Sequence, residues 1–234
     1  MMSADSISAW HPVARSADVR PGANIVAGFA QGQELALWRS GDGAPQAWEN
    51  RCPHRSVRFT LGQVVENRLS CAYHGWQYAA GSGQCTRIPA HPDMAPPSTL
   101  CAKVFSAADA AGMLWVNLAG ETAKAPPPGD IVPAGWSFCR TLAVRADAAS
   151  VRDALARRGF VASRASATTA AWRGLLSQSG AAALVLDAKP RLAFIHLWTD
   201  AAPGTAAMKT LHIAARSLRS EIEEEESRRP QAAA

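Results

Sequence analysis

Four potential metal ligands occur as two short pairs, and this pattern constrains the chain more than any other feature of its sequence. The first pair is Cys52-Pro-His54, and after sixteen further residues the second is Cys71-Ala-Tyr-His74. Apolar segments typical of strands flank each pair, so we expect both pairs on tight loops. A zinc ion accepts two thiolates and two imidazoles, but zinc fingers usually pair cysteine with cysteine and histidine with histidine. One thiolate and one imidazole from each loop suit a two-iron cluster better, with both thiolates on one iron and both imidazoles on the other.

The sequence around the two pairs extends this pattern. The motifs are Glu49–Gly62 and Leu69–Tyr78 around the pairs, Trp10–Ser16 and Leu35–Arg39 before them, and Gly83–Ala90 and Gly112–Val116 after them. Together they resemble the Rieske domain of Rieske-type non-haem iron ring-hydroxylating oxygenases and demethylases, and the resemblance covers residues 10–120. It implies an all-β Rieske domain that binds a [2Fe–2S] cluster. The ligands that it implies are Cys52, His54, Cys71 and His74.

The resemblance also implies a role for each part of the site. The two thiolates would hold the iron that stays ferric, and the two imidazoles the iron that accepts the electron. Replacing two thiolates by neutral imidazoles raises the reduction potential, to about −150 to +300 mV. We expect Gly62 and Gly75 to let the loops turn tightly, and loop amides to donate hydrogen bonds to the sulfurs.

The subtype of Rieske domain follows from two positions in these loops. Respiratory Rieske proteins carry an additional cysteine in each loop, and these cysteines form a disulfide. Val57 and Tyr73 occupy the equivalent positions here, which favours the oxygenase type. Arg55 and Trp76 flank the ligands, where they either shape a docking face or contribute to packing.

The other cysteines and the start of the chain indicate a compartment. Five cysteines are an odd number, and the first residues lack the basic and apolar regions of a secretory signal. We therefore expect a cytoplasmic protein whose cysteines ligate metal rather than form disulfides. Three are interpreted as buried free thiols outside the site: Cys85, Cys101 and Cys139. No uninterrupted apolar stretch reaches roughly 18 residues, so we expect no membrane association.

The charge distribution is uneven along the chain. Residues 1–130 contain ten Lys/Arg and ten Asp/Glu, residues 131–220 contain twelve and four, and the last fourteen residues contain two and five. A basic second half raises the possibility of nucleic-acid binding. It contains no regular array of stacking aromatic residues and no nucleic-acid-binding motif, so we interpret it as a solvated or protein-docking face.

The composition changes near residue 120 and indicates two domains. We expect a Rieske domain over residues 8–120, a Pro-rich linker over 121–135, a small α+β domain over 136–216 and a charged tail over 217–234. The α+β domain is interpreted as a reduced helix-grip domain. Its expected elements are a strand at 138–145, helices at 147–158 and 169–178, and an antiparallel meander of strands at 183–187, 192–199 and 206–214.

The second half lacks the iron motif of complete family members. Those proteins hold a mononuclear iron through one carboxylate and two histidines about five residues apart. Here the two histidines after residue 130 are His196 and His212, sixteen residues apart. His196 alternates with apolar residues, which is typical of a core histidine on a strand. Asp147–Asp153 lies about where the iron-binding helix would start, but no histidine follows it, so we expect no oxygen-activating site in this chain.

Three hypotheses remain for the function. The preferred one is the Rieske electron-transfer subunit of a two-part oxygenase, reduced by an NAD(P)H-dependent reductase and donating to a mononuclear iron on a partner oxygenase chain in a hetero-oligomer. The second is a self-sufficient oxygenase whose iron uses His196, His212 and either Asp187 or Asp200. The third is a free-standing Rieske ferredoxin or redox sensor with an appended interaction domain.

Overall fold

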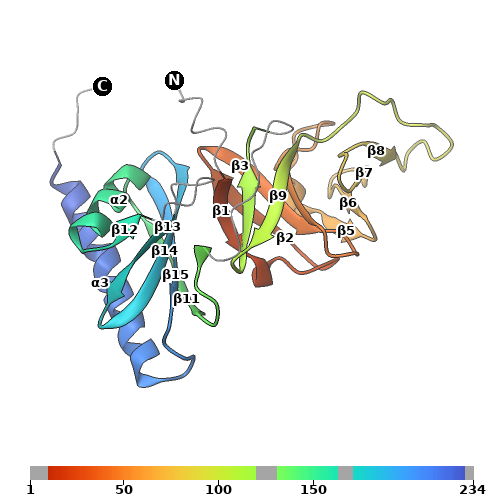
Figure 1. The fold of residues 1–234 in the computed structure, drawn as a ribbon. Coiled ribbons are helices and arrows are strands. Elements are labelled where there is room, and N and C mark those ends of the chain that lie inside the picture. Colours follow the sequence, from red (N-terminus) through yellow and green to blue (C-terminus); the bar gives the residue numbers. More distant parts are fainter. Residues whose placement is uncertain (1–9, 120–130, 163–170, 230–234) are drawn as a thin grey trace. The chain divides into compact units, whose positions relative to one another are not determined.

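The structure is a computed structural model, which describes residues 10–119, 131–162 and 171–229. The chain divides into two compact units, residues 1–126 and residues 127–234 (Figure 1). Most of the expected linker over 121–135 lies outside the described residues. In the part of the chain that the structure describes, no helix has the length and apolar character needed to cross a bilayer.

A six-stranded antiparallel sheet forms the larger part of unit 1. Its strands, in spatial order, are β1 (Trp10–Arg15), β10 (Met113–Asn117), β9 (Val104–Ala110), β4 (Pro45–Glu49), β3 (Gln33–Arg39) and β2 (Ile25–Ala30). Gln31 and Gly32 join β2 to β3 with φ values of 48° and 83°, the two positive angles that a tight hairpin turn requires. All five residues of β10 are buried, because this strand lies inside the sheet between β1 and β9.

A four-stranded antiparallel meander forms the rest of unit 1. Its strands follow one another in sequence: β5 (Gln63–Val65), β6 (Arg68–Ser70), β7 (Gln77–Ala79) and β8 (Cys85–Arg87). Two short 3₁₀ helices complete the unit, η1 (Ser16–Asp18) and η2 (Phe59–Leu61). The all-β character expected for the first half of the chain is thereby confirmed.

A chain of buried aromatic rings connects the two sheets of unit 1. Trp38 on β3 meets Trp48 on β4 edge to face at 5.0 Å, and Trp48 meets Phe59 at 5.7 Å. Phe59 in turn meets Tyr78 on β7 at 5.3 Å. Edge-to-face pairs of this kind stabilise a core beyond the area that they bury. They fix the four-stranded meander, and the loops that it carries, against the larger sheet.

Unit 2 is a five-stranded antiparallel sheet with two helices on one face, which confirms the α+β prediction. The strands, in spatial order, are β11 (Ser137–Val144), β15 (Leu192–Thr199), β14 (Ser179–Lys189), β13 (Ala171–Leu176) and β12 (Val161–Ala162). The helices are α2 (Ala148–Arg157) and α3 (Ala206–Ser227) (Figure 1). Along β15, Ile195 and Leu197 pack into the core shared with the helices, so odd-numbered residues face the helices and even-numbered residues face the other side.

Two of the expected elements of unit 2 are wrong. The helix predicted at 169–178 is strand β13 within the described residues, where Gly174 passes so close to Phe160 that a Cβ atom would lie 2.7 Å from its ring. The strand predicted at 206–214 is the first part of α3. Thr205 caps that helix by accepting a hydrogen bond from the Met208 amide at 3.2 Å.

Helix α3 continues without a break through residue 217, where the charged tail was expected to begin. Its buried residues recur at intervals of three and four, which is the spacing of one helix face: Met208, Leu211, Ala215, Leu218 and Ile222. Glu221 and Glu225 of the same segment are more exposed and pair with Arg158 at the end of α2. The strand at 138–145 and the helix at 147–158 are confirmed as β11 and α2.

Candidate metal centre

Both sequence pairs lie on loops that have the same backbone hydrogen bonds. In the first loop, the Cys52 amide donates to the Val57 carbonyl at 2.9 Å, and the Ser56 amide donates back to Cys52 at 2.8 Å. In the second loop, the Cys71 amide donates to the Trp76 carbonyl at 2.9 Å, and the Gly75 amide donates back to Cys71 at 3.0 Å. Each loop therefore begins at its cysteine and closes over its histidine in an equivalent way.

Two glycines shape the second loop and its approach, by different physical means. Gly75 has φ +67°, a left-handed conformation that glycine adopts without strain, as expected for a tight turn. Gly62 has an ordinary negative φ of −86°. Its importance is a close approach instead, because a Cβ atom there would lie 2.2 Å from the carbonyl oxygen of Ser70. Ser70 immediately precedes Cys71, so this contact sets the position of the second loop.

The four side chains converge between the two loops. Cys52 and Cys71 are buried, with 2% and 4% of their surfaces exposed. The Nδ1 atoms of His54 and His74 face each other at 3.2 Å. His54 is half-buried and His74 is exposed, so the thiols lie on the inner side of the site and the imidazoles on the outer side.

The electrostatics of the thiols favour a bound cation. Burial raises the pKa of Cys71, and the neighbouring Cys52 raises that pKa further, while the amides of Tyr73 and His74 donate to the sulfur and oppose the rise. The Tyr78 hydroxyl lies 3.2 Å from the Cys52 sulfur. Two thiolates in this buried space require positive charge between them, which metal ions supply.

The imidazoles are also suited to metal binding. Burial lowers the pKa of His54, and the nearby charges of His74 and Arg55 lower it further. A lower pKa favours the neutral imidazole, which is the form that binds metal. Across residues 10–119, 131–162 and 171–229, no three or more His, Cys, Asp or Glu side chains group around a single ion. Two thiols beside two imidazoles fit a two-iron cluster, in which each iron takes only two protein ligands.

The remaining cysteines lie apart from this donor set. Cys85 is buried beside the core of unit 1, and its sulfur points toward the Arg87 carbonyl at 3.8 Å. Cys101 is exposed rather than buried, and its thiol donates to Gln84 Oε1 at 3.1 Å. Cys139 belongs to unit 2. All five cysteines of the chain are free thiols, and Cys101 corrects the prediction that the three lying outside the pairs are buried.

Sequence reasoning missed Tyr78 as a functional residue. It is fully buried, and its hydroxyl meets a predicted ligand that precedes it by 26 residues. The signal that could have found it is its position, because a tyrosine on the strand that leaves the second loop points its ring inward beside both cysteines. A buried tyrosine hydroxyl requires a hydrogen-bond partner, and a sulfur ligand provides one.

The two histidines of unit 2 lie on opposite faces of its sheet. His196 is an even-numbered residue of β15 and lies on the face away from the helices, where it shares a hydrogen bond with the hydroxyl of Thr141, its partner on β11, at 2.9 Å. His212 lies on α3, on the helix-covered face, with its Nδ1 atom 3.9 Å from the sulfur of Cys139. The sheet separates the two imidazoles, so this fold does not bring them to one metal ion.

The carboxylates considered with those histidines have neighbours of their own. Asp187 lies on β14, where burial raises its pKa while Arg152 opposes the rise. Asp200 follows β15 and accepts a hydrogen bond from the Gly180 amide at 3.0 Å. The iron site proposed for a self-sufficient oxygenase therefore has no common centre in unit 2.

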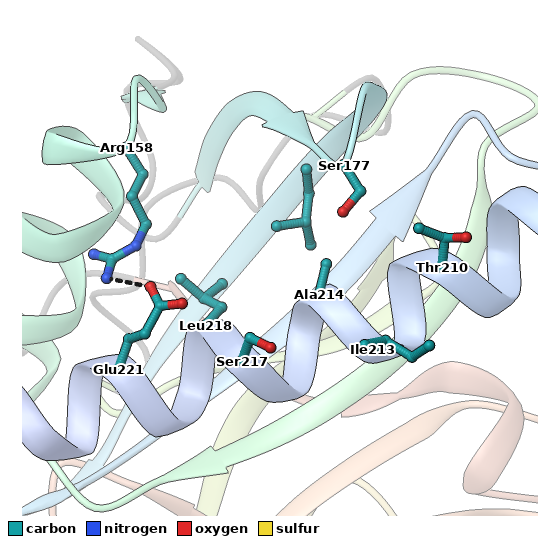
Figure 2. A pocket seen from close by; sticks show the side chains of 9 residues that line it. Arg158, Ser177, Thr210, Ile213, Ala214, Ser217, Leu218 and Glu221 are labelled. Atoms are coloured by element: carbon teal, nitrogen blue, oxygen red, sulfur yellow. Dashed lines mark hydrogen bonds and ion pairs between the residues drawn. The ribbon is translucent and has the colours of Figure 1, made fainter.

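Unit 2 also has an open groove of about 380 Å³ between α3 and the turn from β13 to β14 (Figure 2). Its lining is mixed: Arg158, Leu176, Ser177, Thr210, Ile213, Ala214, Ser217, Leu218 and Glu221. The ion pair between Arg158 and Glu221, at 2.8 Å, closes one end. The groove contains neither histidine nor cysteine, so it is not a part of the candidate metal centre.

Comparison with known proteins identifies the domain. The Rieske [2Fe-2S] domain family matches residues 9–104. The chain is 41% identical over 124 residues to oxidoreductase NdmD of Pseudomonas putida, which covers 53% of the chain and 20% of that protein. It is 32% identical over 110 residues to the 3-chlorobenzoate-3,4-dioxygenase oxygenase subunit of Comamonas testosteroni, covering 47% of the chain and 25% of that protein. The chain thus spans about a fifth to a quarter of these relatives.

Solved structures resemble the chain over nearly its whole length. NdmA of Pseudomonas putida CBB5 matches with a TM-score of 0.70 and 20% identity, over 98% of this chain and 84% of that one. Apo dicamba monooxygenase matches with a TM-score of 0.73 and 16% identity, over 98% of this chain and 92% of that one. At these identities the likeness concerns the fold alone.

The fold and the paired loops define an iron–sulfur protein. More particularly, the chain carries a Rieske [2Fe-2S] domain over residues 9–104, whose cofactor is a [2Fe–2S] cluster, and this half of the chain is similar to an oxygenase subunit and to an oxidoreductase. Unit 2 has the fold found beside the Rieske domain in the solved structures.

Proposed function

We propose that this chain is the Rieske electron-transfer component of a non-haem iron oxygenase system. It receives electrons from an NAD(P)H-dependent reductase and passes them to a mononuclear iron on a partner oxygenase chain. The observation that carries the proposal is the pair of equivalent loops, which bring two buried thiols and two outward-facing imidazoles to one place. A structural zinc site is closed and does not require imidazoles that are accessible from the surface.

The ligands in this proposal are the four residues of the two pairs. Cys52 and Cys71 hold one iron, and His54 and His74 hold the other. The cluster supplies a one-electron couple at a potential raised by its neutral imidazole ligands. Tyr78 donates its hydroxyl hydrogen to the Cys52 sulfur, and the amides of Tyr73 and His74 donate to the Cys71 sulfur.

The surrounding residues separate the site into a dry side and an accessible side. Phe59 and Tyr78 are fully buried and exclude water from the thiols. His74, by contrast, is exposed. Electrons therefore enter and leave most directly at the imidazole edge, because tunnelling between proteins depends on the distance from the redox group to the surface.

The proposal that the mononuclear iron lies on a partner chain rests on the arrangement of unit 2. His196 and His212 lie on opposite faces of its sheet, and neither approaches the other to share an ion. Two relatives, from Comamonas testosteroni and Rhizorhabdus wittichii, are an oxygenase subunit and an oxygenase component by name, which supports a separate electron donor. The division of the two metal sites between chains rests on unit 2 alone, and we propose it for a cytoplasmic hetero-oligomer without nucleic-acid or membrane partners.

Metal analysis of the full chain tests the proposal. We expect about two irons and two acid-labile sulfides per chain after anaerobic purification, and a Rieske-type EPR signal after reduction with dithionite. Cys71→Ser should abolish the signal, and Cys101→Ser, which alters an exposed thiol outside the site, should preserve it. About three irons per chain, or turnover of a substrate by the chain and a reductase alone, would overturn the division between chains. Zinc without sulfide would overturn the cluster itself.

A further inference from the structure

The ligand loops carry an excess of positive charge that the composition of the first half conceals. Residues 1–130 balance ten basic residues with ten acidic ones. Residues 50–58 and 71–77, which form the two loops, contain three arginines and no carboxylate. The balance over the whole unit therefore hides a local excess at the end where the imidazoles reach the surface.

Ion pairs neutralise only a part of this charge. Arg51 and Arg58 both pair with the same carboxylate, Glu34, at 3.0 Å and 2.7 Å. Arg55, next to His54, and Arg87, at the end of β8, are exposed, and no described residue forms an ion pair with either. Arg87 pairs across the sheet with Gln77, which adjoins Trp76, so both arginines border the imidazoles.

Some acidic residues of unit 1 lie at the opposite end of the strands, where basic residues pair with them. Asp42 lies in the turn before β4, whereas the first ligand loop follows the end of β4. Asp109, near the end of β9, accepts hydrogen bonds from Arg39 at 2.7 Å. Arg39 also donates to the Gly43 carbonyl, which lies in the same turn as Asp42. The turn that carries Glu66 joins this end, because Asn67 accepts from the Gly41 amide at 2.8 Å. Because Arg39 and Arg68 pair with the acidic residues there, that end has no excess of positive charge comparable to that of the ligand loops.

The basic end also exposes apolar surface beside the site. Tyr73 is 59% exposed and its ring lies 3.8 Å from that of His74, measured between centroids. Leu61 is 68% exposed and follows the first loop, which it adjoins through the hydrogen bond between its amide and the Arg58 carbonyl. Exposed aromatic and aliphatic side chains within a charged border are typical of protein interfaces.

We propose that this end of unit 1 is a docking face for an acidic surface of a protein that exchanges electrons with the imidazole edge. Arg55 and Arg87 attract the partner, and Tyr73 and Leu61 form its apolar contact. The inference rests on the proposed electron-transfer function.

Small oxidants of opposite charge test the electrostatics without knowledge of the partner. The dithionite-reduced full chain is mixed with ferricyanide, which takes one electron from the reduced protein and becomes ferrocyanide. The same measurement uses the cation tris(phenanthroline)cobalt(III), which becomes the cobalt(II) complex. Ferricyanide should react faster as ionic strength falls, and the cobalt complex more slowly, because screening weakens at low salt.

A matched pair of variants locates the effect. In Arg55→Gln/Arg87→Gln the rate with ferricyanide at low salt should fall about fivefold or more, and the salt dependence should flatten. Arg20→Gln is the control, because Arg20 is exposed near η1, at the end of the unit opposite the ligand loops. Its rate should change by less than about twofold. An octaglutamate peptide should slow ferricyanide with the wild type and not with the double variant, whereas octalysine should have no such effect.

The outcomes distinguish the docking-face proposal from the electron-transfer proposal on which it rests. Intact iron, sulfide and EPR signal with equal rates for the double variant and Arg20→Gln would overturn the docking face and leave the electron-transfer proposal standing. An absent EPR signal in the wild type would overturn the function. Loss of the signal in the double variant alone would show that these arginines support the site structurally, which also contradicts the proposed role.

Discussion

The indole of Trp76 lies flat against the imidazole of His54, with the ring centroids 3.8 Å apart and the planes 4° from parallel. The two rings come from different loops, so the stack joins the first ligand loop to the second. His74 meets Tyr73 of its own loop instead, at a tilt of 34°. The second ligand loop therefore holds His54 in place, and the separation of the two imidazoles depends on Trp76.

Replacing Trp76 should loosen the site. In Trp76→Leu the stack is lost, which is worth about 0.5–1.5 kcal/mol, so the rate of cluster loss in air should rise about 2- to 12-fold. The decay of visible absorbance of the purified full chain measures this rate. Trp76→Phe retains a ring that can stack and should lie close to the wild type. Equal rates for Trp76→Leu and the wild type would contradict a bracing role.

Removing the hydroxyl of Tyr78 should lower the reduction potential. The hydroxyl lies 3.2 Å from the Cys52 sulfur, and a hydrogen bond there stabilises the reduced, more negative form of the site. A net contribution of about 0.5–1.5 kcal/mol corresponds to about 20–60 mV for a one-electron couple. Protein-film voltammetry of Tyr78→Phe measures the shift. The phenylalanine ring retains the edge-to-face contact with Phe59, so the packing serves as an internal control.

A single added methyl group at Gly62 should prevent assembly of the site. The Cβ atom of alanine would lie 2.2 Å from the Ser70 carbonyl oxygen. The backbone fixes the position of the Cβ atom and contains the carbonyl, so no side-chain rotation relieves the contact. Gly62→Ala should displace Cys71 and reduce the iron content of the purified chain at least about fivefold, because one ligand pair is misplaced. Gly81→Ala is the control: its φ is +75° but its Cβ would meet nothing within 4 Å. That variant should cost about 1 kcal/mol of stability and retain its iron. Normal iron content in Gly62→Ala would refute the close-approach argument.

The pair of Arg39 and Asp109 should make the stability of unit 1 sensitive to acid. Hydrogen bonds from Arg39 lower the pKa of Asp109, against the opposing effect of partial burial, and Ser16 adds to the lowering. A carboxyl whose pKa is lower in the folded state stabilises the protein above its ordinary pKa of 3.8, and this stabilisation is lost as the pH falls through the folded-state value.

Urea unfolding of Asp109→Asn checks this dependence. At pH 7 the variant should be less stable by about 1 kcal/mol, a modest value because the carboxylate is 41% exposed and water screens the pair. The difference from the wild type should shrink as the pH falls below about 4. Glu66→Gln removes an exposed carboxylate whose pair with Arg68 is also exposed, and should change stability little at either pH. A difference that stayed constant from pH 7 to pH 3 would show that ionisation of Asp109 has no part in it.

Much of unit 1 could be predicted because its determinants are local. Tight turns, alternating apolar residues and the two ligand pairs are readable within short windows, and they sufficed to predict an all-β unit around the paired loops. Unit 2 was harder, since β13 and the first turns of α3 have apolar patterns that suit either a helix or a strand. Packing decided between them: Gly174 fits under Phe160 in a sheet, and Met208, Leu211 and Ala215 cover that sheet from one helix face.

The sequence by itself determined that two equivalent loops present one cysteine and one histidine each, because coordination chemistry restricts which residue types and spacings can share a cluster. Only the tertiary structure decided which distant groups meet. The Tyr78 hydroxyl at Cys52, the Trp76 ring on His54 and the carbonyl of Ser70 against Gly62 all join segments whose separation no local pattern encodes. The separation of His196 from His212 is likewise a property of sheet faces and helix packing. So is the local excess of positive charge, because strands that run back and forth bring both ligand loops and the end of β8 with Arg87 together.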